Sequence, residues 1–223
     1  MLLLFSRGVG LKTWKKIGNL EREVKLYNYL IEKGLFKKIY FFTYDSEDVE
    51  LSLKLKKERI INENIEVITP PKLTSVPILR DLLSIIFFLF KFNNIKKNCK
   101  IIKTNQIDGS ILIIFLKIIY KKKFYLRSGY NILKRDKILN LNFIKKKINF
   151  FQFIMAIKFA DIISVSNLFD QKYYQIVRKK RVKLIYNFVD TEKFNNLNLN
   201  RNKKFLFIGR ISKEKNIEEL IDF

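Results

Sequence analysis

The stretch FLFIGRISKEKNIEELIDF, residues 205–223, has the pattern of a buried strand, a glycine turn and a helix. Four consecutive apolar residues, Phe205 to Ile208, suit a strand that is covered on both faces. Gly209 follows where a chain that leaves a parallel sheet has to turn sharply. From Ile217 onward, apolar residues recur at helical spacing. A strand, turn and helix of this kind form the repeating unit of an α/β fold.

Two basic residues, Arg210 and Lys215, lie on the loop between this strand and helix. The first turn of a helix leaves backbone N–H groups unpaired, so such a turn can hold a diphosphate. Because the helix dipole contributes only about 0.3–1 kcal/mol, the two side chains would supply most of the attraction. Basic residues at the end of a strand are also commonly no more than solvated charges. The pattern alone leaves both interpretations open.

The same alternation of strand and helix runs through the rest of the chain. We expect strands at residues 2–5, 38–43, 65–69, 100–104, 124–127, 161–165 and 182–186, and helices at residues 20–31, 46–61, 77–92, 109–120, 148–159 and, capped by Asn167, up to Arg178. Residues 6–18 are predicted as a loop, and the Lys- and Asn-rich residues 129–147 as irregular. Repeated βα units predict an α/β fold with a doubly wound parallel sheet.

Residues 207–215 resemble a signature of nucleotide-sugar glycosyltransferases. Phe207-Ile208-Gly209-Arg210 with Glu214-Lys215 is similar to the FVGR…EKG motif that opens the donor-binding domain of the retaining enzymes of family four, which have the GT-B fold. The resemblance implies that Gly209, Arg210 and Lys215 bind the diphosphate of the donor. Asn216 stands where the family usually has a glycine.

Three upstream stretches resemble the same family. Residues 18–23, GNLERE, are similar to its GGxER turn, which faces donor and acceptor, with Asn19 as a residue that tolerates positive φ in place of the second glycine. Residues 160–166, ADIISVS, and 187–194, NFVDTEKF, are similar to its AD.IIAVS strand and its NGVDTERF crossing between domains. The resemblance implies a Rossmann-like amino-terminal domain over residues 1–196. Residues 204–223 would then be the first strand and helix of a truncated donor domain.

Gly18, Asn19 and Arg127 are predicted to line the acceptor side of a cleft. Arg127 ends a strand at the carboxyl edge of the predicted sheet, where α/β folds place ligands. Many members of the resembled family have a histidine near this point, whereas this chain has no histidine, so Arg127 is the only charged substitute. The catalytic residues therefore stay unassigned. Trp14 is either a ring that stacks on a sugar or the packed anchor of its loop.

The resemblance implies transfer of a sugar from a nucleoside diphosphate sugar to a glycan or lipid-linked acceptor, in the synthesis of cell-envelope polysaccharide or glycolipid. No cofactor and no metal is expected, because positive groups would stabilise the leaving diphosphate. The stretch 205–223 supplies one strand and about three helical turns, far less than an independent α/β domain. We therefore expect residues 1–223 alone to show no turnover.

The composition limits the class of protein and its partners. A hydrophobic content of 48% in 223 residues excludes a disordered chain, so the net charge of +24 lies on a folded surface. Three sources of this charge stay open: a coding bias toward Lys, Ile, Asn and Phe, an anionic membrane surface as partner, and nucleic acid. Nucleic acid is the least favoured, because the lysines do not gather in one segment.

Two rival interpretations remain from the sequence. One is a non-enzymatic polyanion-binding module that uses the basic runs 121–123, 145–147 and 178–181, and the other is an inactive fragment. The single cysteine, Cys99, fits a cytoplasmic protein. The apolar runs 82–90 and 111–120 are too short to cross a bilayer. The charge and the apolar residues 85–90 predict peripheral association with the inner face of a membrane.

Overall fold

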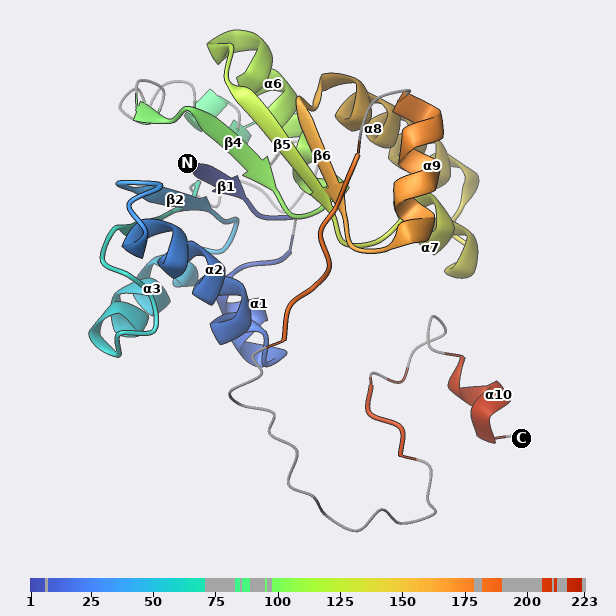
Figure 1. The fold of residues 1–223 in the computed structure, drawn as a ribbon, viewed down its shortest axis with the longest axis horizontal. Helices are drawn as coiled ribbons and strands as arrows, with labels where there is room; N and C mark the ends of the chain where they lie inside the picture. Colours follow the sequence, from blue (N-terminus) through green and yellow to red (C-terminus); the bar gives the residue numbers. More distant parts are fainter. Residues whose placement is uncertain are drawn as a thin grey trace.

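The computed structural model describes residues 1–6, 8–70, 83–84, 86–88, 95, 98–178, 182–189, 206–209, 211 and 216–221. Its central feature is a sheet of seven strands, in the order β3-β2-β1-β4-β5-β6-β7 (Figure 1). All neighbouring strands are parallel. The strands are β1 (Leu2–Leu4), β2 (Ile39–Phe42), β3 (Ile65–Ile68), β4 (Ile101–Thr104), β5 (Lys123–Ser128), β6 (Ile162–Val165) and β7 (Lys183–Leu184). The predicted doubly wound parallel sheet is confirmed.

Helices cover both faces of the sheet (Figure 1). They are α1 (Leu11–Lys16), α2 (Leu20–Glu32), α3 (Glu47–Lys57), the short 3₁₀ helix η1 (Ile107–Gly109), α6 (Ser110–Tyr120), α7 (Ile132–Ile138), α8 (Phe143–Phe159) and α9 (Leu168–Arg178). Leu3 packs into one core with Val24 of α2 and Leu55 of α3. Leu4 enters a second core with Ile113 of α6. Successive residues of β1 reach different cores because the side chains of a strand alternate between its faces.

One face of the sheet is left partly open at β5 and β6. Phe124 and Leu126 of β5 are buried under α6 and α8, whereas Tyr125 and Arg127, which alternate with them along the strand, are only half-buried. Ile162 of β6, paired with Tyr125, is exposed. Helices α1, α2 and α3 lie over β1 and β2 in Figure 1, away from this part of the sheet. The carboxyl end of β5 is therefore accessible beside α2.

Helix α1 lies in the segment that was predicted as a loop, so that prediction was wrong. Its N-cap, Gly10, has no side chain, and the carboxylate of Asp48 in α3 takes over the capping role by accepting a hydrogen bond from the backbone N–H of Lys12, at 2.9 Å. A cap from a residue 36 positions away leaves no local signal. The indole of Trp14 in α1 is buried against Phe5, with ring centroids 4.4 Å apart, so it is a packed anchor and not a sugar-stacking ring.

The predicted irregular stretch 129–147 contains α7 and the start of α8, another correction. Asn131 caps α7, since its side chain accepts hydrogen bonds from the backbone N–H groups of Leu133 and Lys134. Asn142 caps α8 in the same way, accepting from Lys145. Helix α8 therefore begins five residues before the predicted start at Ile148. The predicted cap at Asn167 is confirmed, because its side chain accepts from the N–H of Asp170 at 2.8 Å.

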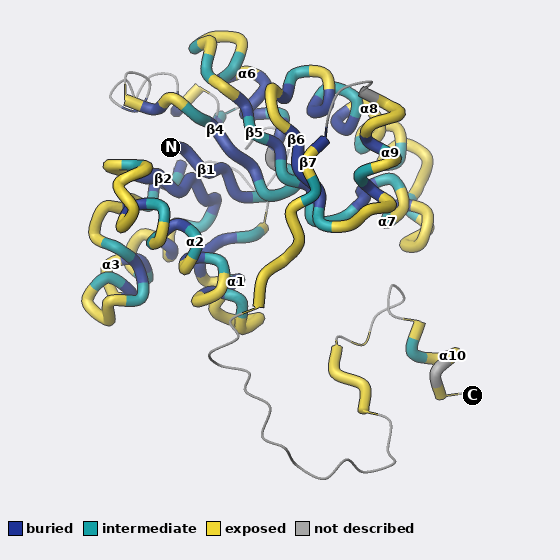
Figure 2. Tube along the Cα trace, in the orientation of Figure 1, coloured by how far each residue is buried: buried dark blue, intermediate teal, exposed yellow. Residues whose placement is uncertain are grey.

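The carboxyl-terminal stretch folds only in part. Residues 206–208 are exposed and belong to no strand, so the predicted strand is not found in the described residues (Figure 2). A strand needs a neighbour for its backbone hydrogen bonds, and the described chain offers it none. The predicted helix is present as α10 (Ile217–Ile221). Asn216 before it has φ +48°, in the left-handed region, where the resembled family has a glycine.

Two further expectations concern apolar segments. Most of the predicted helix at residues 77–92 lies outside the described residues, although residues 83–84 and 86–88 are helical. Helix α6 contributes Ile113 and Leu116 to the core, as expected for residues 111–120. Among the described helices, not one has the length and apolar character needed to cross a membrane.

Candidate functional site

The Gly18 turn and α2 form one wall of a groove. Gly18 adopts φ +70°, a left-handed conformation that suits glycine, while Asn19 has φ −98° and serves as the N-cap of α2. The tolerance of Asn19 for positive φ is therefore not used, because the turn places that conformation one residue earlier, at Gly18. The N–H of Asn19 donates to the carbonyl of Trp14 at 2.9 Å, which fixes the turn against α1.

The opposite wall is the extended chain that follows β7. Phe188 and Val189 face α2 across a groove of about 580 Å³, whose remaining lining is mostly polar: Gly18, Asn19, Glu21, Arg22, Val24, Lys25, Asn28 and Ile60. In Figure 2 this segment is an exposed length of chain that runs from β7 toward α1 and α2. The groove thus lies between an early and a late segment of the chain. A ligand in it would meet the apolar ring of Phe188 on one side and the charged side chains of α2 on the other.

Arg127 lies next to this groove at the carboxyl end of β5. Its Nη2 donates a hydrogen bond of 2.6 Å to Oδ1 of Asn187, the residue before Phe188. Gly18 and Asn19 line the groove, whereas Arg127 is not in its lining and bonds to the segment that forms its far wall. The neighbours of Arg127 are engaged elsewhere: Ser128 Oγ lies 2.8 Å from the buried Tyr174 hydroxyl, and the N–H of Gly129 donates to Gln106. Arg127 is therefore the residue of this stretch that faces the open side.

A buried lysine, which the sequence analysis did not single out, lies on the same face of the sheet. Lys103 of β4 is 4% exposed, and its Nζ donates to the Tyr27 hydroxyl of α2 at 2.8 Å and to Oδ1 of Asn105. Register pairs Lys103 with Tyr125, two residues before Arg127. The sequence of β4, Ile-Ile-Lys-Thr, could have revealed this residue, since a lysine inside a buried strand is rare.

Burial changes the ionisation of this lysine. Desolvation, with repulsion from Arg127 as a second cause, lowers the pKa of Lys103 to about 7, while Glu23 acts in the opposite direction. Desolvation also raises the pKa of its partner Tyr27. Lys103 therefore changes charge near neutral pH, and it lies beneath α2 within the electrostatic influence of Arg127.

The predicted diphosphate site lies mostly outside the described residues. Gly209 is exposed, and Arg210 and Lys215 lie outside the described residues. Their role stays a prediction, as do the acceptor-side roles of Gly18, Asn19 and Arg127. The described part of the chain contains no group of three or more acidic, cysteine or histidine residues able to hold a metal ion.

Comparisons with known proteins show a shared fold. Three similar solved structures are complexes of Anabaena HepE (Alr3699): with UDP and glucose (14% identity, TM-score 0.51), with UDP (15%, 0.50) and with UDP-glucose (14%, 0.50). Each match covers 86% of this chain. The chain spans only 44–45% of the length of these neighbours. No family model and no curated protein in the comparison matches the chain.

Proposed function

We propose that this chain is the acceptor-side part of a glycosyltransferase that uses a nucleoside diphosphate sugar. The groove between the Gly18 turn and Phe188 carries this proposal, because one of its walls is the chain that leaves β7 at the carboxyl edge of a doubly wound sheet, where such folds bind ligands. Two likenesses support it. The fold is similar to that of HepE, which binds UDP-glucose, and the motifs at residues 18–23, 160–166, 187–194 and 207–215 resemble the glycosyltransferases of family four.

The finer assignment rests on the motifs. A retaining transfer by a GT-B enzyme, to a glycan or lipid-linked acceptor of the cell envelope, is the reaction of the family that they resemble. Arg210 and Lys215 would hold the donor diphosphate and stabilise the charge that develops on it as the sugar leaves. Arg127 would place a positive charge between the groove and the reacting sugar. No metal takes part in this scheme.

Substitution of the two basic residues tests this proposal in a version of the chain extended through a full donor domain. A charge-assisted hydrogen bond to phosphate contributes about 1.5–3 kcal/mol. We therefore expect Arg210→Ala and Lys215→Ala each to lower kcat/KM for the donor by roughly tenfold to a hundredfold. The neighbouring Lys213→Ala is the matched control and should change it little. Unchanged kinetics in both variants would remove the diphosphate assignment.

A further inference from the structure

Helix α8 is apolar on two opposite sides, and only one of them is covered. Phe153, Ala156 and Ile157 are buried in the core against the sheet. On the other side Phe143, Ile144, Ile148 and Phe151 point to solvent, with Phe143 70% and Phe151 66% exposed. The residues 144, 148 and 151 follow the spacing of a single helical face. A helix that is apolar all round is normally buried on all sides, so this face lacks a covering partner in the described structure.

Lysines are interleaved with these apolar side chains. Lys145, Lys146 and Lys147 follow Phe143 and Ile144 directly, and Lys147 Nζ lies 4.5 Å from the centroid of the Phe143 ring. Residues 137–160 contain five lysines and no Asp or Glu. The adjacent Asp136 is buried and accepts a hydrogen bond from Asn149 at 2.7 Å. The surface formed by Phe143, Ile144, Ile148, Phe151 and Lys145–Lys147, here called the α8 patch, therefore combines exposed rings with three lysines that have no acidic residue in their own segment.

We infer that the α8 patch binds the surface of an anionic lipid bilayer, with its phenylalanine and isoleucine side chains in the interface and its lysines against the headgroups. Exposed apolar side chains among lysines on a helix suit this environment, because the rings leave water while the ammonium groups meet phosphate. A nucleic acid or another soluble polyanion would use the lysines but leave the apolar face in water. A second copy of the chain would bring two sets of like charges together.

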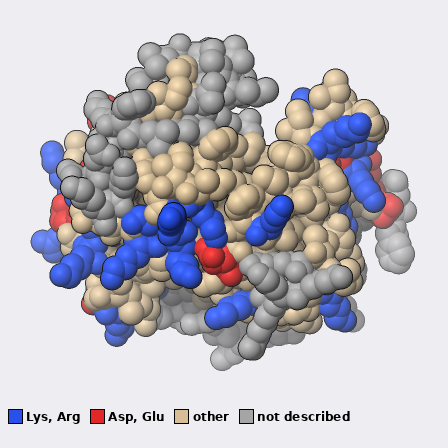
Figure 3. All heavy atoms as spheres, turned by 90° about the horizontal axis from the view of Figure 1, so that it is seen from above, with Lys and Arg blue, Asp and Glu red and all other residues tan. Residues whose placement is uncertain are grey.

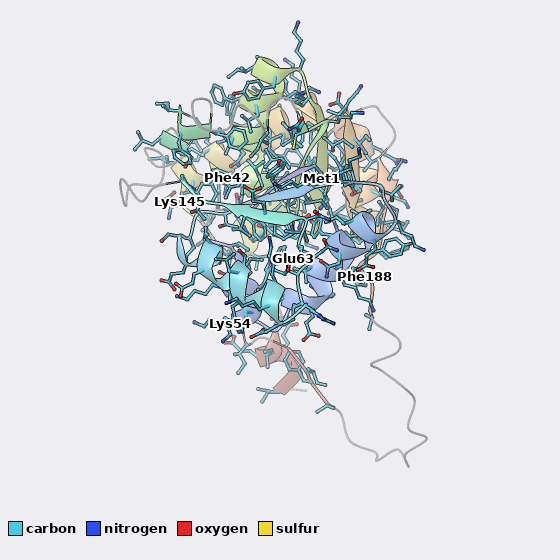
Figure 4. All side chains as sticks on the ribbon, turned by 90° about the vertical axis from the view of Figure 1, so that its left-hand side faces the viewer. Met1, Phe42, Lys54, Glu63, Lys145 and Phe188 are labelled. Atoms are coloured by element: carbon cyan, nitrogen blue, oxygen red, sulfur yellow. The ribbon has the colours of Figure 1, made fainter. Side chains whose placement is uncertain are left out.

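The α8 patch is separate from the groove. Figure 4 shows Lys145 and Phe188 on opposite sides of the molecule, so a bilayer on one leaves the other accessible. In the segment where a membrane contact was expected, residues 85–90, Phe88 is buried in the core against Phe42 and Ile86 is exposed, so that expectation stays a prediction. The inference does not depend on the proposed transferase activity, and it can hold or fail without it.

Cosedimentation of the 223-residue chain with vesicles tests the inference. We expect binding to phosphatidylcholine mixed with phosphatidylglycerol, little binding to phosphatidylcholine alone, and weaker binding at high salt. Removing a lysine costs about fivefold in affinity at a charged membrane, so Lys145→Ala/Lys146→Ala/Lys147→Ala should bind on the order of 100-fold more weakly. Phe143→Ser/Phe151→Ser should lose at least about tenfold, since two exposed rings no longer enter the interface.

The matched control removes the same charge elsewhere. Lys123 begins β5, and Lys121→Ala/Lys122→Ala/Lys123→Ala changes three lysines at the amino edge of the sheet. Figure 3 shows that further Lys and Arg side chains lie on the face seen from above, so a test of total charge needs this control. This control variant should lose far less affinity for anionic vesicles than the triple variant at Lys145–Lys147. Circular dichroism should show that all variants fold, because the changed side chains lie outside the core.

Four results would overturn the inference. Equal binding to neutral and anionic vesicles would remove the electrostatic contribution, and an equal loss in both lysine variants would mean that total charge alone matters. Full lipid binding by Phe143→Ser/Phe151→Ser would show that the rings do not enter the interface and that the lysines act alone, as they would on any polyanion. A dimer in light scattering that this double variant makes monomeric, without any lipid binding, would show that a second copy covers the α8 patch.

Discussion

Two short apolar runs in this chain, Leu2–Leu4 and residues 206–208, have similar sequences and opposite environments. Each residue of Leu2–Leu4 is at most 1% exposed, and the run pairs with β2 on one side and β4 on the other. Leu206 and Ile208 are 81% and 85% exposed and lie in no strand. The difference shows that an apolar run forms a strand only where neighbouring strands satisfy its backbone and helices cover its side chains.

The largest expected effect follows directly from this comparison. Leu3→Ala removes a side chain packed between β1 and α2 and should lower the free energy of unfolding by about 2–5 kcal/mol. Leu206→Ala makes the same chemical change in an exposed side chain and should stay within about 0.5 kcal/mol of the parent chain. Urea denaturation followed by circular dichroism measures both. A loss of several kcal/mol in Leu206→Ala would mean that the tail packs on the domain.

A smaller effect on stability is expected from Lys103 of β4, a basic residue buried within the sheet. Its folded-state pKa of about 7 lies below the ordinary value of 10.5, so between these values the unfolded chain binds more protons than the folded chain. Stability should therefore rise with pH across this window, by about 2 kcal/mol from pH 7 to pH 9. Lys103→Met should remove this part of the pH dependence.

Denaturation midpoints of the two proteins at several pH values check this prediction. The measurements should stop below about pH 9.5, because burial raises the pKa of Tyr27, Tyr130 and Tyr174, and unfolding then exposes tyrosines that ionise more easily. Their contribution lowers stability as the pH rises further. Parallel pH profiles for the parent and Lys103→Met would contradict a neutral buried lysine.

The sequence was sufficient for those parts of the fold that depend on local patterns. The strand at Leu2–Leu4, the helix from Leu20 and the Asn167 cap follow from apolar spacing and from a polar side chain next to its own helix. Helix α1 was missed because its cap, Asp48, belongs to a distant helix. Helix α7 was missed although its cap, Asn131, bonds to residues only two and three positions further on. Among so many lysines and asparagines, this asparagine could not be recognised as a cap.

The candidate site was predictable only in part, for the same reason. Gly18 and Arg127 could be placed at the carboxyl edge from the order of strands and turns alone. The groove wall at Phe188 depends on how the chain after β7 crosses back toward α2, which no local pattern encodes. The burial of Lys103 depends on α2 covering the middle of β4, a contact between residues 76 positions apart.

The central claim has two parts. The groove forms the acceptor half of the site, and the half that binds the donor diphosphate requires a folded donor domain around residues 205–223. Calorimetric titration of the 223-residue chain with UDP-glucose, and with GDP-mannose in parallel, tests it most directly. The exposed state of residues 206–209 predicts no saturable binding at millimolar donor, because water and salt screen isolated cations. A chain extended through the donor domain should bind one of the two donors, and Lys215→Ala should weaken that binding. Saturable, base-specific binding by residues 1–223 alone would contradict the account.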